Sequence, residues 1–291
     1  MKVDDVLAWL ERAASIMVAC VGERITDEYV YVEAAQKSPK DSLVVWVERN
    51  RETFAGGVEA VYRHAAGFSR ARLVGNGGAI VKTRWLEVPW MHKVFSNTGV
   101  NVSVPPLQSI DGSADCHLVV DFGHGLLDNT AIVMLLSCKR FLALTVQANA
   151  LNYGFHTLRR WRSADYVVID HAELRLATGD QSGELEALAQ QERERLGARC
   201  LAVTLGHLGC IVVDADGVIS VPVVKGPVVD RMGAGDAFLG ATAALACVGA
   251  PKEVLGLVGN IAGSLHSGVI GNSSSVSREQ VEAKLREILD A

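Results

Sequence analysis

The sequence lacks the features that mark several large classes of protein. No apolar run is long enough to cross a bilayer, and the amino-terminal stretch MKVDDVLAWLERAAS has neither the basic start nor the apolar core of a signal peptide. The net charge of −5 gives no positive field that favours nucleic acid. None of the six cysteines forms a CxxC pair, so no zinc or disulfide framework is indicated. We therefore expect a cytoplasmic protein that binds neither nucleic acid nor membranes.

What the sequence does contain is the pattern of a layered α/β protein. Of its 291 residues, 49% are hydrophobic, which is enough for a sizeable core. Short β-branched runs alternate with helical patterns, which predicts a mainly parallel sheet covered by helices on both faces. We predict strands at 16–21, 43–47, 118–121, 142–146, 166–169, 201–204 and 211–214. We predict helices at the amino terminus and near 54–66, 130–139, 183–196, 235–248, 252–267 and 277–289.

Two stretches interrupt this alternation. Residues 28–52 contain two extended segments, YVYVEA and SLVVWVER, joined by the polar QKSPKD. Residues 81–95 contribute another extended segment, within IVKTRWLEV. Together they predict a small antiparallel β lid beside the main sheet. Because no long linker or internal repeat divides the chain, we expect a single domain over 1–291 that includes this lid.

The strongest chemical signal lies near the carboxyl end, in the segment DRMGAGDAFLG at 230–240. Gly233 and Gly235 flank Ala234 and let the backbone turn sharply and come close to a ligand. The unpaired N–H groups that open the following helix, together with its dipole, form a site for an anion such as a transferred phosphoryl group. Asp236 is placed to take the proton from an attacking hydroxyl. An aspartate in a first turn also serves as a simple helix cap.

Two other nucleotide-binding motifs fit this segment poorly. A dinucleotide fold needs GxGxxG after an early strand, whereas the spacing here is GxGxxxxG and lies late in the chain. A Walker loop needs a GK[ST] ending, which is absent. The segment instead resembles the DTxGAGD signature of the ribokinase (PfkB) type of carbohydrate kinase.

That resemblance implies a ribokinase-like three-layer sandwich, in which a mainly parallel sheet is flanked by helices and carries a small β lid. It implies an ATP-dependent sugar kinase, in which the γ-phosphate passes to a hydroxyl of a sugar or sugar phosphate in the presence of Mg²⁺. Asp236 would be the base, and Gly233, Ala234 and Gly235 would form the anion site. A requirement for a monovalent cation stays open.

Other segments follow the order of the family's motifs, and each has a plainer explanation. Asp27 matches the substrate-binding acid that follows the first strand, but it could be a surface acid. Gly56 and Gly57 match the double glycine of the sugar pocket, but they could simply start a helix. Asp170 and Glu173 stand where the family has NxxE, near magnesium and the phosphates, and their spacing places them on one helical face. The resemblance further implies nucleotide contacts from Thr204, Gly206, Arg231, Asn260 and Gly263.

One subgroup of the family is especially similar. The segment DFGHG at 121–125 resembles the DYGKG of heptose 7-phosphate kinases, and Lys82 and Arg84 would suit a substrate phosphate or, alternatively, a solvated strand edge. Arg231 replaces the usual threonine and either neutralises phosphate or pairs with Asp230. In that subgroup the kinase is often fused to a nucleotidyltransferase; no HxGH motif occurs here, so that activity is either absent or on another chain. Family habit and the exposed-looking lid aromatics Tyr29, Tyr31 and Trp46 also predict a homodimer; alternatively, these aromatics pack within the lid itself.

The substrate side departs from the family's pattern. No asparagine follows the double glycine, the segment between His64 and Lys82 is short, and TVQANALN replaces the DPK expected after the strand near Val146. These departures leave two alternatives open: a non-catalytic module that binds sugar or nucleotide, and a nucleoside kinase of the same fold. We interpret three scattered histidines as ordinary loop residues: His124, His171 and His207.

Overall fold

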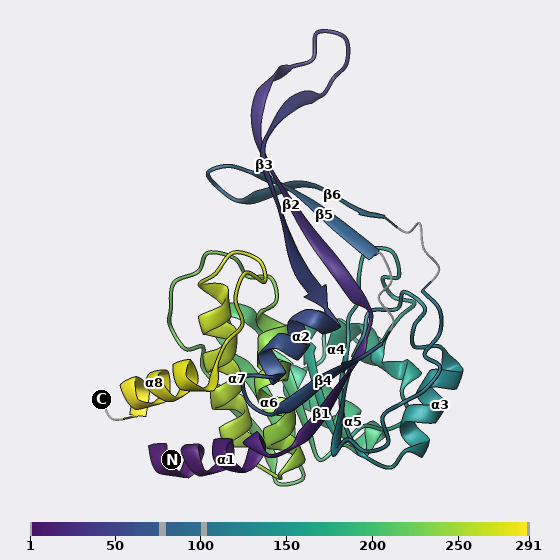
Figure 1. Cartoon of the computed structure of the whole chain (residues 1–291), viewed down its shortest axis with the longest axis vertical. Coiled ribbons are helices and arrows are strands. Elements are labelled where there is room, and N and C mark those ends of the chain that lie inside the picture. Colours follow the sequence, from purple (N-terminus) through teal and green to yellow (C-terminus); the bar gives the residue numbers. More distant parts are fainter. Residues whose placement is uncertain (1, 76–79, 100–103, 290–291) are drawn as a thin grey trace.

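The computed structural model describes residues 2–75, 80–99 and 104–289. They form an eight-stranded sheet within the body of the molecule and a four-stranded sheet that stands beyond it (Figure 1). Helices cover both faces of the larger sheet, so the predicted three-layer α/β arrangement is confirmed. Among the described residues, no helix is both long and apolar enough to span a membrane.

The larger sheet has the strand order β12-β11-β10-β9-β8-β7-β1-β4. Neighbours from β4 to β10 run parallel, whereas β11 and β12 add antiparallel strands at one edge. The inner strands are buried on both faces, which accounts for their continuous apolar runs. The strands are β1 (Met17–Gly22), β4 (Arg70–Val74), β7 (Cys116–Asp121), β8 (Phe141–Val146), β9 (Tyr166–Asp170), β10 (Cys200–Thr204), β11 (Cys210–Asp214) and β12 (Gly217–Val221).

Helices α2, α6 and α7 pack on one face of this sheet, and α4 and α5 pack on the other. Helix α6 is buried along most of its length, because its alanines and glycine let it lie closely against the sheet, α2 and α7. The helices are α1 (Val3–Ala14), α2 (Val58–Ala65), α3 (Asn129–Ser137), α4 (His171–Thr178), α5 (Leu185–Leu196), α6 (Ala234–Cys247), α7 (Lys252–Ser267) and α8 (Arg278–Leu289), with short 3-10 turns η1 (Leu158–Arg160) and η2 (Gly206–Leu208).

The smaller sheet is the lid, with the strand order β3-β2-β5-β6. Strand β2 (Arg24–Lys37) follows β1 after one residue and forms a long hairpin with β3 (Val44–Gly57), whose far end projects away from the body (Figure 1). Strands β5 (Ile80–Glu87) and β6 (His92–Gly99) form a second hairpin. The prediction of an antiparallel lid is wrong in one respect, since β2 and β5 run parallel. The chain passes through α2 and β4 before it returns to the lid, and this crossover makes the two strands parallel.

The remaining differences from the sequence prediction concern short elements and their ends. The lid occupies 24–57 and 80–99 rather than 28–52 and 81–95, and β4, β12 and α4 were not predicted. Helix α2 begins at Val58 rather than near residue 54, because the preceding residues still belong to β3. Gly57, with a φ of +61°, makes the turn between them.

Candidate active site

The DRMGAGD segment forms the turn that opens α6. Gly233 precedes the first turn of the helix with a φ of +80°, a left-handed conformation that glycine adopts without strain. A Cβ atom there would lie 2.5 Å from Nε2 of His266, so no larger residue fits. The carboxylate of Asp230 accepts hydrogen bonds from the N–H of Met232 (3.0 Å) and from the hydroxyl of Tyr29 (2.7 Å). The turn is therefore fixed to lid strand β2.

Asp236 lies in the first turn of α6 but does not act as its cap. Its Oδ1 accepts a hydrogen bond from Nε2 of Gln147 (3.4 Å), and within the described residues it accepts none from the N–H groups of the turn. The residue lies where two cavities of about 700 Å³ and about 230 Å³ meet. Among the described residues, Asp236 and Gln147 are the two that line both cavities. The carboxylate therefore faces open space on two sides of the site.

The surroundings of Asp236 suit a general base. Burial raises its pKa to about 7, and the carboxylate of Asp27 acts in the same direction. The positive charges of Lys82 and Arg84 act in the opposite direction. A carboxyl group that titrates near neutral pH is well matched to accept a proton from a reacting hydroxyl.

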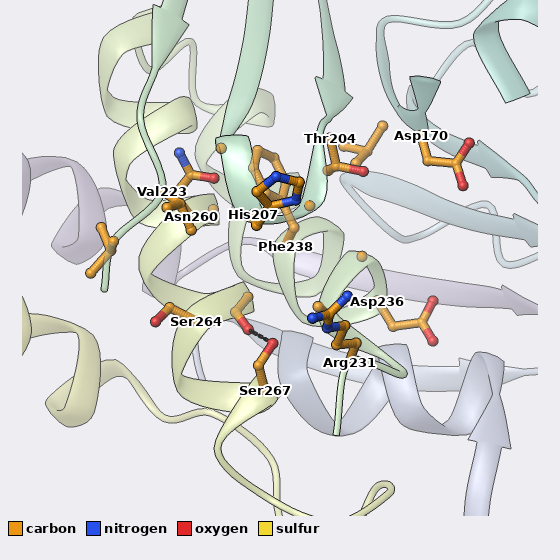
Figure 2. A pocket seen from close by; sticks show the side chains of 18 of the residues that line it. Asp170, Thr204, His207, Val223, Arg231, Asp236, Phe238, Asn260, Ser264 and Ser267 are labelled. Carbon is orange, nitrogen blue, oxygen red and sulfur yellow. Dashed lines mark hydrogen bonds between the residues drawn. The ribbon is translucent and has the colours of Figure 1, made fainter. Parts of the chain in front are cut away.

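The larger cavity lies beyond the carboxyl ends of β8, β9 and β10, where ligands bind in parallel sheets. Figure 2 shows Val223 and Asn260 toward one end of this cavity and Asp170 and Asp236 toward the other, with His207 between them. The structure brings together all of the residues that were predicted to contact a nucleotide: Thr204, Gly206, Arg231, Asn260 and Gly263. Ala234 and Gly235, at the start of α6, line the same cavity.

Two of these side chains have distinct surroundings. The Nδ2 group of Asn260 donates to the carbonyl oxygens of Val221 (3.0 Å) and Pro222 (3.2 Å), which leaves its Oδ1 as an acceptor. Arg231 is exposed and, within the described residues, makes no ion pair with Asp230. The alternative in which these two residues neutralise each other is therefore wrong, and the guanidinium stays available to the cavity.

Sequence reasoning missed several residues of this cavity. His171 and His207, interpreted as ordinary loop residues, both line it. So do Lys225, Ser264 and Ser267. On α7 the cavity residues recur three or four positions apart, so a search along the helical face that carries Asn260 would have found the two serines.

Asp170 and Glu173 begin α4 and cap it reciprocally. Oδ1 of Asp170 accepts from the N–H of Glu173 (2.7 Å), and Oε2 of Glu173 accepts from the N–H of Asp170 (2.9 Å). Oε1 of Glu173 also accepts from the N–H of Ala148 (3.2 Å). Burial, and then the neighbouring Asp170, raise the pKa of Glu173 to about 8.

These two carboxylates fit a magnesium ion that is held mainly by water and phosphate oxygens. Magnesium in nucleotide sites usually takes one or two protein carboxylates, and both residues line the larger cavity. In the described part of the chain, no group of three or more His, Cys, Asp or Glu side chains could hold a metal ion by itself. A nearby cation would also stabilise the ionised form of the buried Glu173 carboxyl.

The smaller cavity lies between the lid and the turn. Asp27 and Lys82 are opposite each other on neighbouring strands, and Arg84 forms an ion pair with Asp27. Gly57 lines the cavity, whereas Gly56 lies behind it: a Cβ atom on Gly56 would be 2.3 Å from Oδ2 of Asp27. The predicted substrate residues thus form one cluster, in which Gly56 leaves room for the Asp27 carboxylate.

Lys82 is the unusual cation of this cavity. It lies on β5, an inner strand of the lid, so the interpretation as a solvated strand edge is wrong. Burial lowers its pKa, and its Nζ lies 4.9 Å from the centre of the Phe122 ring. Among the described residues, no carboxylate forms an ion pair with it. A partly desolvated ammonium without a counter-ion favours an anionic ligand.

The sequence analysis did not single out Glu23, which anchors the DFGHG segment. Its side chain is fully buried, and its carboxylate accepts hydrogen bonds from the N–H groups of Phe122 (3.2 Å) and His124 (3.1 Å). Asp121 is buried as well and accepts from Nε1 of Trp161 (2.9 Å). The carboxylates of Glu23 and Asp121 therefore hold the DFGHG segment in place, and the segment positions Phe122 beside Lys82.

The arrangement of the sheets and helices defines a ribokinase-like α/β protein, and known structures agree. Ribokinase from Thermotoga maritima has a TM-score of 0.70 at 20% identity, with 94% of this chain and 99% of that chain covered. Arabidopsis thaliana ribokinase, solved in complex with ribose and ATP, has a TM-score of 0.69 at 18% identity, with the same coverage. At these identities the similarity establishes the fold.

The sequence comparisons show which proteins the chain is similar to. The model of the pfkB family of carbohydrate kinases matches residues 137–278. The bifunctional protein HldE of Rhodospirillum rubrum is 24% identical over 329 residues, which cover 96% of this chain and 66% of that protein. This chain thus spans just under two thirds of the length of that relative. Over residues 137–278 the chain is similar to the pfkB family of carbohydrate kinases.

Proposed function

We propose that the protein transfers the γ-phosphate of ATP to a hydroxyl of a sugar or sugar phosphate. The observation that carries this proposal is the position of Asp236 at the junction of two cavities. The larger cavity reaches the start of α6, whose free N–H groups suit phosphate, and the smaller one presents side chains that bind hydroxyl groups. The match of residues 137–278 to the model of a carbohydrate kinase family supports the same reaction.

On the donor side, the nucleotide base would lie toward Asn260 and His207, and the phosphates toward Gly233–Gly235. Figure 2 supports this orientation, because Asn260 and Asp236, the residue that follows Gly235, lie toward opposite ends of the cavity. The N–H groups of the turn and the Arg231 guanidinium would stabilise the charge of the transferred phosphoryl group. Asp170 and Glu173 would hold Mg²⁺, which offsets phosphate charge when bound.

On the acceptor side, Asp27 would accept hydrogen bonds from sugar hydroxyls, with Gly57 allowing close approach of the backbone. Asp236 would take the proton of the reacting hydroxyl while its oxygen bonds to the γ-phosphorus. The bond from that phosphorus to the bridging oxygen breaks in the same step, and ADP leaves. Only the ionised form of Asp236 can do this, which links turnover to its pKa.

The charge of the smaller cavity favours a phosphorylated acceptor over a neutral sugar. Asp27 already neutralises Arg84, whereas Lys82 is partly desolvated and has no carboxylate partner among the described residues. A substrate phosphate would supply that missing negative charge. The similarity of the DFGHG segment at 121–125 to heptose 7-phosphate kinases makes a heptose 7-phosphate the first acceptor to test.

The test is a coupled assay of ADP release from ATP with a panel of sugars, sugar phosphates and nucleosides. We expect turnover with a sugar phosphate, and we expect Asp236→Asn to lower kcat by roughly 10²–10⁴-fold while the variant stays folded. Nucleotide binding without turnover on any acceptor would instead identify a non-catalytic binding module. Turnover confined to nucleosides would identify a nucleoside kinase of the same fold.

The lid also supports a homodimer, but not through Tyr29 and Tyr31, which are 2% and 7% exposed and are buried in one cluster with Leu86. The far end of the β2–β3 hairpin projects from the body without a third strand beside it (Figure 1). Its side chains include Leu43, Val44 and Val45, which are 52%, 47% and 43% exposed. A two-stranded ribbon with exposed apolar residues is marginal in water by itself. A second copy of the chain that covers this hairpin would remove the apolar surface from solvent.

Sedimentation velocity tests the dimer. The wild-type protein should sediment as a dimer at micromolar concentration, and Val45→Asp should shift it toward monomer without loss of secondary structure. A wild-type protein that stays monomeric would refute this assembly. We further propose a cytoplasmic location, which suits an ATP-using enzyme whose six cysteines are free thiols.

A further inference from the structure

Gln147 lies directly after β8, at the carboxyl edge of the main sheet. Its backbone N–H donates to the carbonyl oxygen of Asp121 (3.0 Å), which extends the pairing of β8 with β7 by one residue. This backbone contact leaves the side chain pointing toward the site. In the sequence, Gln147 stood out only as part of TVQANALN, a departure from the family's pattern.

The side chain of Gln147 contacts Asp236 at the boundary between the two cavities. Its Nε2 donates to Oδ1 of Asp236 over 3.4 Å, and it is the one residue besides Asp236 that lines both described cavities. The two cavities therefore adjoin at these two side chains. Gln147 comes from the sheet and Asp236 from α6, so the boundary has one polar group on each side.

The chemistry of an amide limits what Gln147 can do there. It donates and accepts hydrogen bonds but does not take up a proton at neutral pH, so it does not replace Asp236 as base. The charged groups that act on Asp236 are Asp27, Lys82 and Arg84 from the lid strands, and Glu173 acts on it from α4, beside the larger cavity. Gln147 is therefore the neutral donor that contacts Asp236 from the sheet side.

We propose that Gln147 is a positioning residue for phosphoryl transfer, whose amide holds Oδ1 of Asp236 so that Oδ2 faces the acceptor hydroxyl. This inference rests on the proposed kinase function. Asp236 is on the first turn of a helix beside open cavities, so without this hydrogen bond its carboxylate is free to rotate. A misdirected base lowers the rate of the chemical step while leaving both binding sites in place.

The kinetic test compares Gln147→Met, which has a similar shape but no donor, with Gln147→Glu, which adds a negative charge. Gln147→Met should lower kcat by about 10- to 100-fold with little change in KM for ATP or the acceptor. The acid limb of its pH–rate profile should move to higher pH by about half a unit to one unit, since the donor stabilised the ionised carboxylate. Gln147→Glu should move the limb further in the same direction. Unchanged kcat and an unchanged limb in Gln147→Met would overturn the proposal.

A second measurement does not require turnover, so it separates this proposal from the proposed function. Carbon-13 NMR of aspartate-labelled protein, with Asp236→Asn to assign the signal, reports the titration of Asp236 directly. Gln147→Met should raise the titration midpoint even if no acceptor is found, whereas an unchanged midpoint overturns the inference. Asn149→Ala is the matched control, because Asn149 in the same turn bonds the carbonyl of Phe122 and does not contact Asp236. It should leave the midpoint where it is.

Discussion

Replacing Asp236 by asparagine should make the fold more stable at alkaline pH while it removes most of the activity. The reason lies in the energetic cost of an ionised carboxylate at this site. Burial raises the pKa of Asp236 from its ordinary 3.8 to about 7, so the folded protein holds the proton more tightly than the unfolded chain does. Asparagine has a similar shape and carries no charge, so it avoids this cost.

The pH window and the size of the effect follow from that shift. Below about pH 4 the carboxyl group is protonated in both states, and it imposes no penalty. Between about pH 4 and 7 the unfolded chain ionises first, so this group lowers the stability of the folded state as pH rises; above pH 7 the penalty is constant. Each pH unit by which the pKa is raised on folding corresponds to about 1.4 kcal/mol, so the loss of stability has an upper limit of about 4 kcal/mol. Because both cavities admit water, we expect about 1–3 kcal/mol.

The assay is urea unfolding of wild type and Asp236→Asn at pH 4.5 and pH 8. At each pH, the free energy of unfolding of wild type is subtracted from that of Asp236→Asn. This difference is then compared between pH 4.5 and pH 8. Effects of the amide that do not depend on pH are the same at both values and therefore cancel. Asp216→Asn, at an exposed position after β11, controls for the loss of one surface charge. The reasoning is refuted if the Asp236→Asn protein gains no stability over wild type between these two pH values.

Three further predictions follow from the site. Because the base must be ionised, kcat/KM should fall about tenfold per pH unit below pH 7 and level off above it, and a profile that is flat from pH 5.5 to 8 would contradict this. Lys82→Met should raise KM for a phosphorylated acceptor by about 10- to 100-fold and leave a neutral acceptor unaffected, as measured in the coupled assay. Gly57→Ala should lower the free energy of unfolding, measured in urea, by more than about 1 kcal/mol, because φ is +61° and a Cβ atom would lie 2.3 Å from the carbonyl oxygen of Glu23. The control is Gly179→Ala, which has a φ of +74° but an open surrounding, so it measures the cost of the φ angle alone.

The parallel core could be predicted from the sequence because its strands are buried on both faces and therefore appear as continuous apolar runs. Strand β4 could not, since the segment RARLV is short and carries two arginines at the edge of the sheet. The parallel pairing of β2 with β5 is also invisible in local patterns. It depends on where the chain goes between them, and residue alternation is the same for both directions of pairing.

In the site, too, local features could be predicted from the sequence and contacts between distant segments could not. The GAGD turn is local, so glycine conformation and helix-end chemistry were enough to locate Asp236. Contacts between distant segments were not predictable, such as the hydrogen bond from Tyr29 to Asp230 or the pairing of Arg84 with Asp27. Gln147 was hidden for a further reason, since a single polar residue after a strand has no pattern that separates it from an ordinary loop residue.

The two cavities draw on different parts of the chain. The residues that line the larger one fall between Thr145 and Ser267, inside the span that matches the family model, whereas the smaller one takes its lid and loop residues, from Ile25 to Phe122, from the part that precedes this span. Under the proposed function, substitutions in the first 125 residues would alter which alcohol is accepted without disturbing how the phosphate is delivered. A lineage could exchange one sugar for another by remodelling a few lid strands, with the donor machinery inherited intact.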